Sequence, residues 1–201
     1  MSGVDLQSLA LPGAILILFT SLALLTFQDE RASLGILGLQ YIGVFILVDA
    51  SWPLEMAVAK MIAGWMSGAI LGMAMTSTSS VWDNSEKSIK LGPLFRILAA
   101  IIVVLTISSL VLHSQLWLSK IDIELRWGSF ILIGLGILQL SLTSHPFRII
   151  IALLTALSGF EILYAAIETS TLVTGLLAGV NLGLALVGAY LLISPTMETN
   201  P

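Results

Sequence analysis

Long apolar stretches separated by short polar joints run along this chain of 201 residues. A helix of about 20 apolar residues crosses the hydrocarbon core of a bilayer, and roughly 17–25 are tolerated. Seven stretches fit that length: 9–27, 33–50, 53–75, 94–113, 127–143, 147–167 and 170–194. The pattern predicts an all-α fold, a polytopic membrane helical bundle of about seven transmembrane helices. The stretch 127–143 is the weakest, and six spans are the alternative.

Composition agrees with a membrane protein and excludes several functions. Hydrophobic residues make up 57% of the chain and charged residues only 10%, whereas soluble domains carry about 25% charged residues. The net charge of −4 and the lack of a basic patch argue against nucleic-acid binding. Cysteine is absent, so the chain offers no thiolate ligands for an iron–sulfur cluster.

The basic residues predict an orientation in the membrane. Seven spans place five of them on one side, namely Arg31, Lys87, Lys90, Arg96 and Arg148, and two on the other, Lys120 and Arg126. Loops rich in Lys and Arg stay in the cytoplasm. The N-terminus is therefore expected outside and the C-terminus in the cytoplasm.

Two similar glycine rows indicate an internal repeat. Gly64, Gly68 and Gly72 recur at intervals of four, as do Gly175, Gly179 and Gly183. We expect a parallel repeat of two three-helix units, at 1–75 and 127–201, joined by a polar loop and connector helix at 76–126. Small residues on one face let helix backbones approach closely. The rows are expected to hold the bundle together or to receive a helix of another subunit.

Glu161 is the most informative polar residue, because it lies inside the apolar stretch 149–167. A carboxylate at the centre of a membrane helix costs about 2.5–3.5 kcal/mol on insertion scales. It must be protonated, paired with a cation or surrounded by polar groups. A proton relay, a structural hydrogen-bonding role and substrate binding all stay open.

Lys60 is the second candidate, on a helix otherwise rich in Ala, Met, Ile and Gly. Its side chain either extends to the membrane surface or pairs with an acid, Glu55 nearby or Glu161 on another span. Gln40 and Asn181 are polar residues that we expect to support such a site. Together these residues are the candidate proton path.

Catalytic templates are missing from the sequence. It has no phosphate-binding glycine loop, no metal-ligand spacing and no nucleophile–base–orienter set. His113 and His145 fall at opposite predicted faces, so they do not ligate one haem iron. We expect no metal, no cofactor and no complete active site in this chain.

Several short motifs resemble a known family. Arg148, in a short loop, lies 13 residues before Glu161 on the next helix. A helix rich in small residues follows, containing Leu182-Gly-Leu-Ala-Leu186. Lys60 comes early in the third span, and Gly92-Pro93 opens the fourth. The pattern resembles the hydrogenase-4 component E family. Its back half is similar to subunit K of the respiratory NADH–quinone oxidoreductase and to the corresponding small membrane protein of Mrp antiporters.

The resemblance implies a non-catalytic membrane subunit of an ion-translocating, energy-converting complex in the prokaryotic inner membrane. Its implied partners are antiporter-like membrane subunits and lipids, and its implied role is in a proton path and in assembly. The chain departs from subunit K at the second membrane Glu, where Gly179 stands with only Asn181 nearby. A purely structural subunit and a small stand-alone transporter are the alternatives.

Overall fold

Helices account for nearly all of the structure, a computed structural model that describes residues 6–27, 29–78 and 92–198. The helices in this part of the chain are α1 (Leu6–Thr26), α2 (Glu30–Asp49), α3 (Leu54–Thr78), α4 (Pro93–Ser114), α5 (Ile123–Ser141), α6 (Pro146–Ile167) and α7 (Thr171–Glu198). All seven are long and apolar enough to cross a membrane. The protein is therefore an all-α, multi-pass membrane protein, and the alternative of six spans is wrong.

Helix boundaries differ from the predictions where polar groups stabilise a helix end. The Asp29 side chain accepts a hydrogen bond from the Arg31 backbone nitrogen (3.1 Å), so α2 begins earlier than predicted. The weakest predicted span also begins earlier, at Ile123, because Leu125 and Arg126 are buried in its first turns. Helix α3 extends into the polar loop that was predicted to begin at residue 76. Residues 79–91 of that loop, with Lys87 and Lys90, lie outside the described residues.

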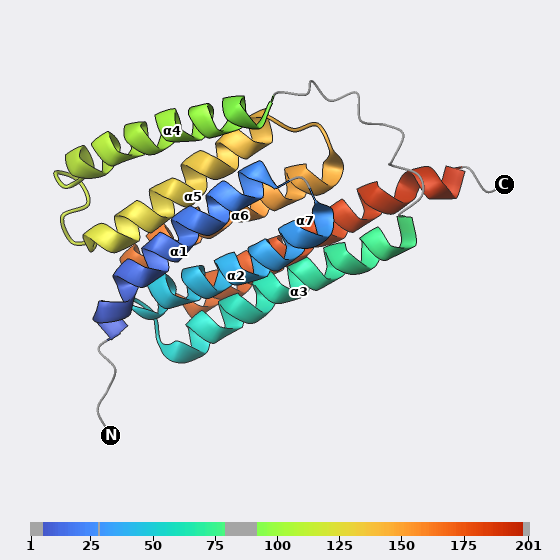
Figure 1. The fold of residues 1–201 in the computed structure, drawn as a ribbon. Helices are drawn as coiled ribbons and strands as arrows, with labels where there is room; N and C mark the ends of the chain where they lie inside the picture. The colour runs from blue at the N-terminus through green and yellow to red at the C-terminus, as the bar shows by residue number, and fades with distance from the viewer. Residues whose placement is uncertain (1–5, 28, 79–91, 199–201) are drawn as a thin grey trace.

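Helices α2 and α6 contact each other, and each also contacts at least two further helices (Figure 1). Contacts join α1 to α5, α2 to α6 and α3 to α7, and these are the helices that the predicted repeat would relate to each other. Helix α4 lies at one edge of the bundle against α5 and α1, and α3 and α7 lie at the opposite edge. The division into units at 1–75, 76–126 and 127–201 stays a prediction.

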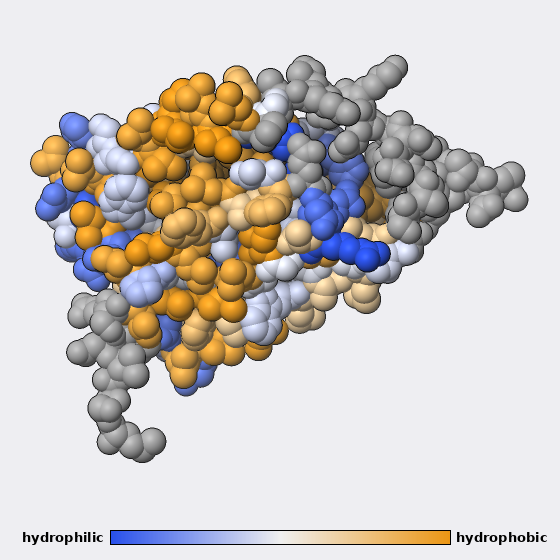
Figure 2. Space-filling model, in the orientation of Figure 1, coloured by the Kyte–Doolittle hydropathy of each residue, from blue (hydrophilic) through white to orange (hydrophobic). Residues whose placement is uncertain are grey.

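The bundle has two ends, which we name after residues that lie there. The Trp52 end holds the joints between α2 and α3, α4 and α5, and α6 and α7; the Arg148 end holds those between α1 and α2 and between α5 and α6. Figure 2 shows apolar groups over most of the middle of one face and hydrophilic groups toward the two ends. That distribution suits a bilayer around the middle of the bundle.

Two arginines attach the peripheral helix α4 at its two ends. Near the Arg148 end, Arg96 Nη1 donates to the backbone oxygen of Leu25 at the end of α1 (3.4 Å). At the Trp52 end, Arg126 Nη1 on α5 donates to Ser114 Oγ, in the last turn of α4 (3.3 Å). A cation at a helix C-terminus also interacts favourably with the helix dipole. Many large apolar side chains of α4 are exposed and suit contact with lipid.

Glycines allow the closest approach between α5 and α6. A Cβ at Gly159 would lie 2.6 Å from the backbone oxygen of Ser129, and a Cβ at Gly136 would lie 2.8 Å from the backbone nitrogen of Ala156. No side chain fits at either position without moving a backbone. These contacts fix α6, which carries Glu161, against α5.

Candidate functional site

A buried ion pair joins α3 to α6. Lys60 Nζ on α3 meets Glu161 Oε2 on α6, and their side chains are only 4% and 1% exposed. Lys60 is six residues from the start of α3, and Glu161 is six residues from the end of α6. At 1.5 Å per residue, both lie about 9 Å inside the Trp52 end. The antiparallel directions of the two helices therefore bring the charges to the same depth.

Asn181 on α7 completes one side of the carboxylate. Its Nδ2 donates a hydrogen bond to Glu161 Oε1 (2.9 Å), so each carboxylate oxygen has a partner. Asn181 is fully buried, and its own Oδ1 has no hydrogen-bond partner among the described residues. The site is thus built by three helices, with one acceptor left free to receive a proton donor.

Tyr41 on α2 forms the wall beneath the ammonium group. Lys60 Nζ lies 5.2 Å from the centroid of the Tyr41 ring, within the range of a cation–π interaction. The ring in turn lies against Gly64 on α3, where an added Cβ would come within 2.3 Å of it. Gly64 therefore leaves the space that lets Tyr41 sit below Lys60.

Substituting Gly64 with Ala is expected to destabilise the protein by about 1–3 kcal/mol, because the Tyr41 ring must move from an already packed position. The matched control is Gly68→Ala, since a Cβ at Gly68 meets nothing within 4 Å. Unfolding of both variants in mixed micelles measures the difference. Equal stability of the two variants would contradict the packing described for Tyr41.

The two groups can share one proton in a buried environment. With the proton on Lys60, the site holds a cation and an anion; with the proton on Glu161, both groups are neutral. Isolated buried charges are costly, and pairing with further hydrogen bonds offsets part of that cost. Both arrangements keep the net charge of the site at zero, so a proton can move between the two groups without leaving an uncompensated charge.

The structure brings some of the predicted site residues together and separates others. Glu161, Lys60 and Asn181 meet, so Lys60 does not extend to the membrane surface. Gln40 lies in a neighbouring polar group and bonds to Ser21 on α1. Glu55 is exposed in the first turn of α3, and Lys60 pairs with Glu161 instead, so a supporting part for Glu55 stays a prediction.

Sequence reasoning missed the hydroxyl groups and Tyr41. Buried Thr and Ser residues are common in membrane helices, and their hydroxyls can bond to their own backbone, as that of Ser67 does. Only the packing of the helices distinguishes such self-bonded hydroxyls from those of Ser21 and Thr155, which bond to Gln40. The one available signal was that Tyr41 follows Gln40 inside an apolar span.

The glycine rows do not hold this bundle together as predicted. Gly64 and Gly72 lie against Tyr41 and Leu34. At the remaining four positions, Gly68, Gly175, Gly179 and Gly183, an added Cβ would meet no described residue within 4 Å. The packing face of α7 is instead the one with Asn181, Ala185 and Gly188. The prediction that these four glycines pack against helices of this chain is therefore wrong. Docking of another subunit's helix on them stays a prediction.

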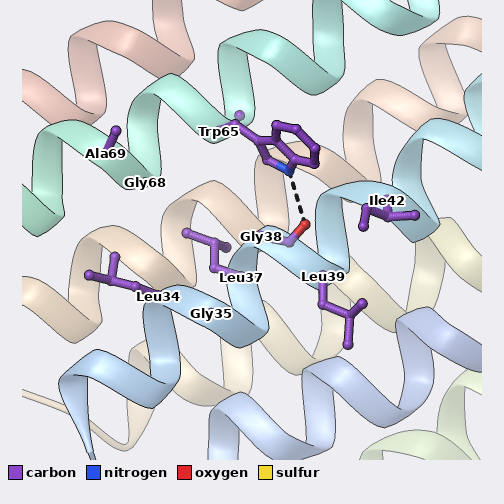
Figure 3. A pocket seen from close by; sticks show the side chains of 10 residues that line it. Leu34, Gly35, Leu37, Gly38, Leu39, Ile42, Trp65, Gly68 and Ala69 are labelled. Carbon is purple, nitrogen blue, oxygen red and sulfur yellow. Dashed lines mark hydrogen bonds between the residues drawn. The ribbon is translucent and has the colours of Figure 1, made fainter.

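A shallow groove of about 440 Å³ lies between α2 and α3, one turn from Lys60 (Figure 3). Glycines and apolar side chains line most of it, including Gly35, Gly38 and Gly64. Trp65 Nε1 donates a hydrogen bond to the Gly38 backbone oxygen across the groove (3.1 Å). None of the residues that line the groove is ionisable, unlike the buried pair one turn away.

No protein-family model, curated protein or solved structure matches this chain. Among the residues that the structure describes, no group of three or more His, Cys, Asp or Glu side chains is arranged to hold a metal ion. The site described above therefore rests on the geometry of Lys60, Glu161, Asn181 and Tyr41 alone.

Proposed function

We propose that this protein is a membrane subunit of an ion-translocating, energy-converting complex of the hydrogenase-4 or NADH dehydrogenase type. In it, the Lys60–Glu161 pair holds a proton and passes it on. The observation that carries the proposal is an ion pair that is almost fully buried at membrane depth. Ionisable residues inside a membrane domain are expensive and mark ion pathways more often than packing.

The arrangement around the pair supports proton handling over packing. Structural stability does not require a buried ion pair, since apolar side chains of similar volume often serve as well or better. Among the described residues, Asn181 Oδ1 and the Tyr41 hydroxyl make no hydrogen bond, so the site is incompletely bonded. An incompletely bonded polar site suits groups whose proton positions change.

We infer that the chain is a subunit of a complex rather than an enzyme by itself. In this proposal the redox chemistry lies on other chains, and the partners are antiporter-like membrane subunits that continue the proton path. The outward-facing glycines Gly175, Gly179 and Gly183 offer such a subunit a smooth helix face. The complex lies in the prokaryotic inner membrane, with the Arg148 end of this chain in the cytoplasm.

The first test is gentle purification from native membranes, followed by mass spectrometry of the chains that co-purify. Antiporter-like chains together with hydrogenase-like or dehydrogenase-like chains in fixed ratio are expected. Isolation of the protein alone as a monomer or homodimer would contradict the subunit proposal and favour a stand-alone transporter.

The second test is proton translocation by the assembled complex in membrane vesicles. Glu161→Gln is expected to lower the rate by about a hundredfold, the lower range for loss of a positioned proton-transfer group. The control is Glu55→Gln, which removes an exposed acid at the same end of the bundle. Because Glu161→Gln leaves Lys60 without its acid, Lys60→Met/Glu161→Met is measured as well.

That double variant separates proton transfer from packing. It has no ionisable group at the site and no unpaired charge, so it should assemble but translocate protons as poorly as Glu161→Gln. Normal translocation by an assembled Lys60→Met/Glu161→Met complex would show that the pair is a structural element only.

A further inference from the structure

A row of buried polar side chains continues from the ion pair toward the Arg148 end. Its members are Tyr41 and Gln40 on α2, Ser158 and Thr155 on α6, and Ser21 on α1. Each is 3% exposed or less. We name these five residues the polar row. They lie among apolar helices, where such groups need partners inside the protein.

Hydrogen bonds across three helices connect one half of the polar row. Thr155 Oγ1 donates to Gln40 Oε1 (3.4 Å), and Gln40 Nε2 donates to Ser21 Oγ (3.1 Å). The amide of Gln40 therefore links a hydroxyl on α6 to a hydroxyl on α1. A single side chain thus bridges the two halves of the chain at the centre of the bundle.

The other half of the polar row reaches the ion pair. Tyr41 lies under Lys60, and its buried hydroxyl makes no hydrogen bond within the part of the chain that the structure describes. Ser158 lies within reach of that hydroxyl and donates its own proton to the Leu154 backbone oxygen (2.8 Å), so its lone pairs can accept. Ser158 is also less than one helical turn from Thr155.

The polar row covers much of the distance between the pair and the Arg148 end. At 1.5 Å per residue, Glu161 is about 22 Å from the start of α6, and Thr155 is about 14 Å from it. Ser21 is only about 8 Å from the end of α1. Toward the Trp52 end stand two aromatic rings instead, Trp52 and Tyr164, in edge-to-face contact at 6.3 Å.

We propose that the polar row is a proton route between the Lys60–Glu161 pair and the Arg148 end of the bundle, an inference that rests on the proposed function. Through this route the pair exchanges protons with the Arg148 end and not with the Trp52 end. The aromatic contact of Trp52 with Tyr164, and the hydrogen bond from Trp52 Nε1 to the Glu168 backbone oxygen (2.9 Å), stabilise the opposite end.

Each step breaks one O–H or N–H bond on a donor and forms one on its acceptor. A proton from Glu161 adds to the Tyr41 oxygen as the Tyr41 proton passes to Ser158, and so on to Thr155. At Gln40 the Thr155 proton adds to Oε1 while an Nε2 proton leaves for Ser21 Oγ, and Ser21 releases its own hydroxyl proton to water that enters from the Arg148 end. Gln40 is then an imidic acid, and a water molecule restores the amide by moving the proton from oxygen to nitrogen.

The test interrupts the polar row while leaving the pair in place. Gln40→Leu removes both hydrogen bonds of the amide and should slow proton translocation by the assembled complex by about a hundredfold, the lower range for a positioned proton-transfer group. Gln139→Leu is the matched control, because Gln139 is also buried but lies on α5 outside the polar row. Ser21→Ala should also slow translocation, and its control is Ser67→Ala, whose hydroxyl bonds only to its own helix.

Two readouts make the outcome decisive. Infrared detection of the protonated Glu161 carboxyl, by difference from Glu161→Gln, should give an unchanged band in Gln40→Leu if only the route is lost. Slow translocation by Glu161→Gln with normal translocation by Gln40→Leu and Ser21→Ala would overturn the route and leave the proposed function standing. Normal translocation by Glu161→Gln would overturn the proposed function itself.

Discussion

Lys60→Met alone is expected to lower the free energy of unfolding by about 3–5 kcal/mol, the usual cost of removing one partner from a buried ion pair. The loss arises because Glu161 stays buried at 1% exposure with only Asn181 to bond to. Glu161→Met should be similarly costly, since it leaves the ammonium of Lys60 with only the Tyr41 ring. Reversible unfolding in mixed detergent micelles measures each value.

The double variant Lys60→Met/Glu161→Met should recover most of that loss. Replacing both charges by apolar side chains of similar size is often neutral or stabilising, because no buried charge remains. The coupling between the two sites is then several kcal/mol, far beyond the roughly 0.5 kcal/mol scatter of independent sites. Additive effects of the two single substitutions would show that the side chains do not interact in the membrane.

Gly159→Ala carries the second large expected effect. The new methyl group would lie 2.6 Å from the backbone oxygen of Ser129 and 2.8 Å from Leu132 Cβ. Neither atom belongs to the flexible end of a side chain, so α5 and α6 must separate. A cost at or above the upper end of the range of about 1–3 kcal/mol for overpacking follows.

The matched control is Gly175→Ala, because a Cβ at that position of α7 meets nothing within 4 Å. It should change the stability of the isolated chain by no more than about 0.5 kcal/mol, as surface substitutions do. The same unfolding measurement serves for both. A tolerated Gly159→Ala beside a destabilising Gly175→Ala would reverse the assignment of packing faces on these helices.

The helices were predictable from the sequence because a span needs only local information. The length of the apolar stretches alone predicts the seven helices α1 to α7. The predicted span of α5 was the weakest because it left out Leu125 and Arg126, which the structure buries. Glu161 and Lys60 were recognisable for the same reason, since a charge within an apolar stretch stands out.

The partners of these residues could not be predicted, because they depend on which helices become neighbours. Lys60 had Glu55 within one and a half turns on its own helix, yet the structure pairs it with Glu161, about 100 residues away. The glycine rows failed for a related reason. Spacing by four identifies a smooth face on α7, but the face with Asn181 and Gly188 packs against the bundle instead.

The single crossing of α4 has a topological consequence for the ion pair. Because one helix separates the first three from the last three, α3 and α7 cross the membrane in the same direction and α6 in the opposite one. A chain without α4 would insert its last three helices upside down. Glu161 would then lie in the opposite leaflet from Lys60. The presence of α4, a peripheral helix that carries no part of the site, therefore decides whether the two charges can meet.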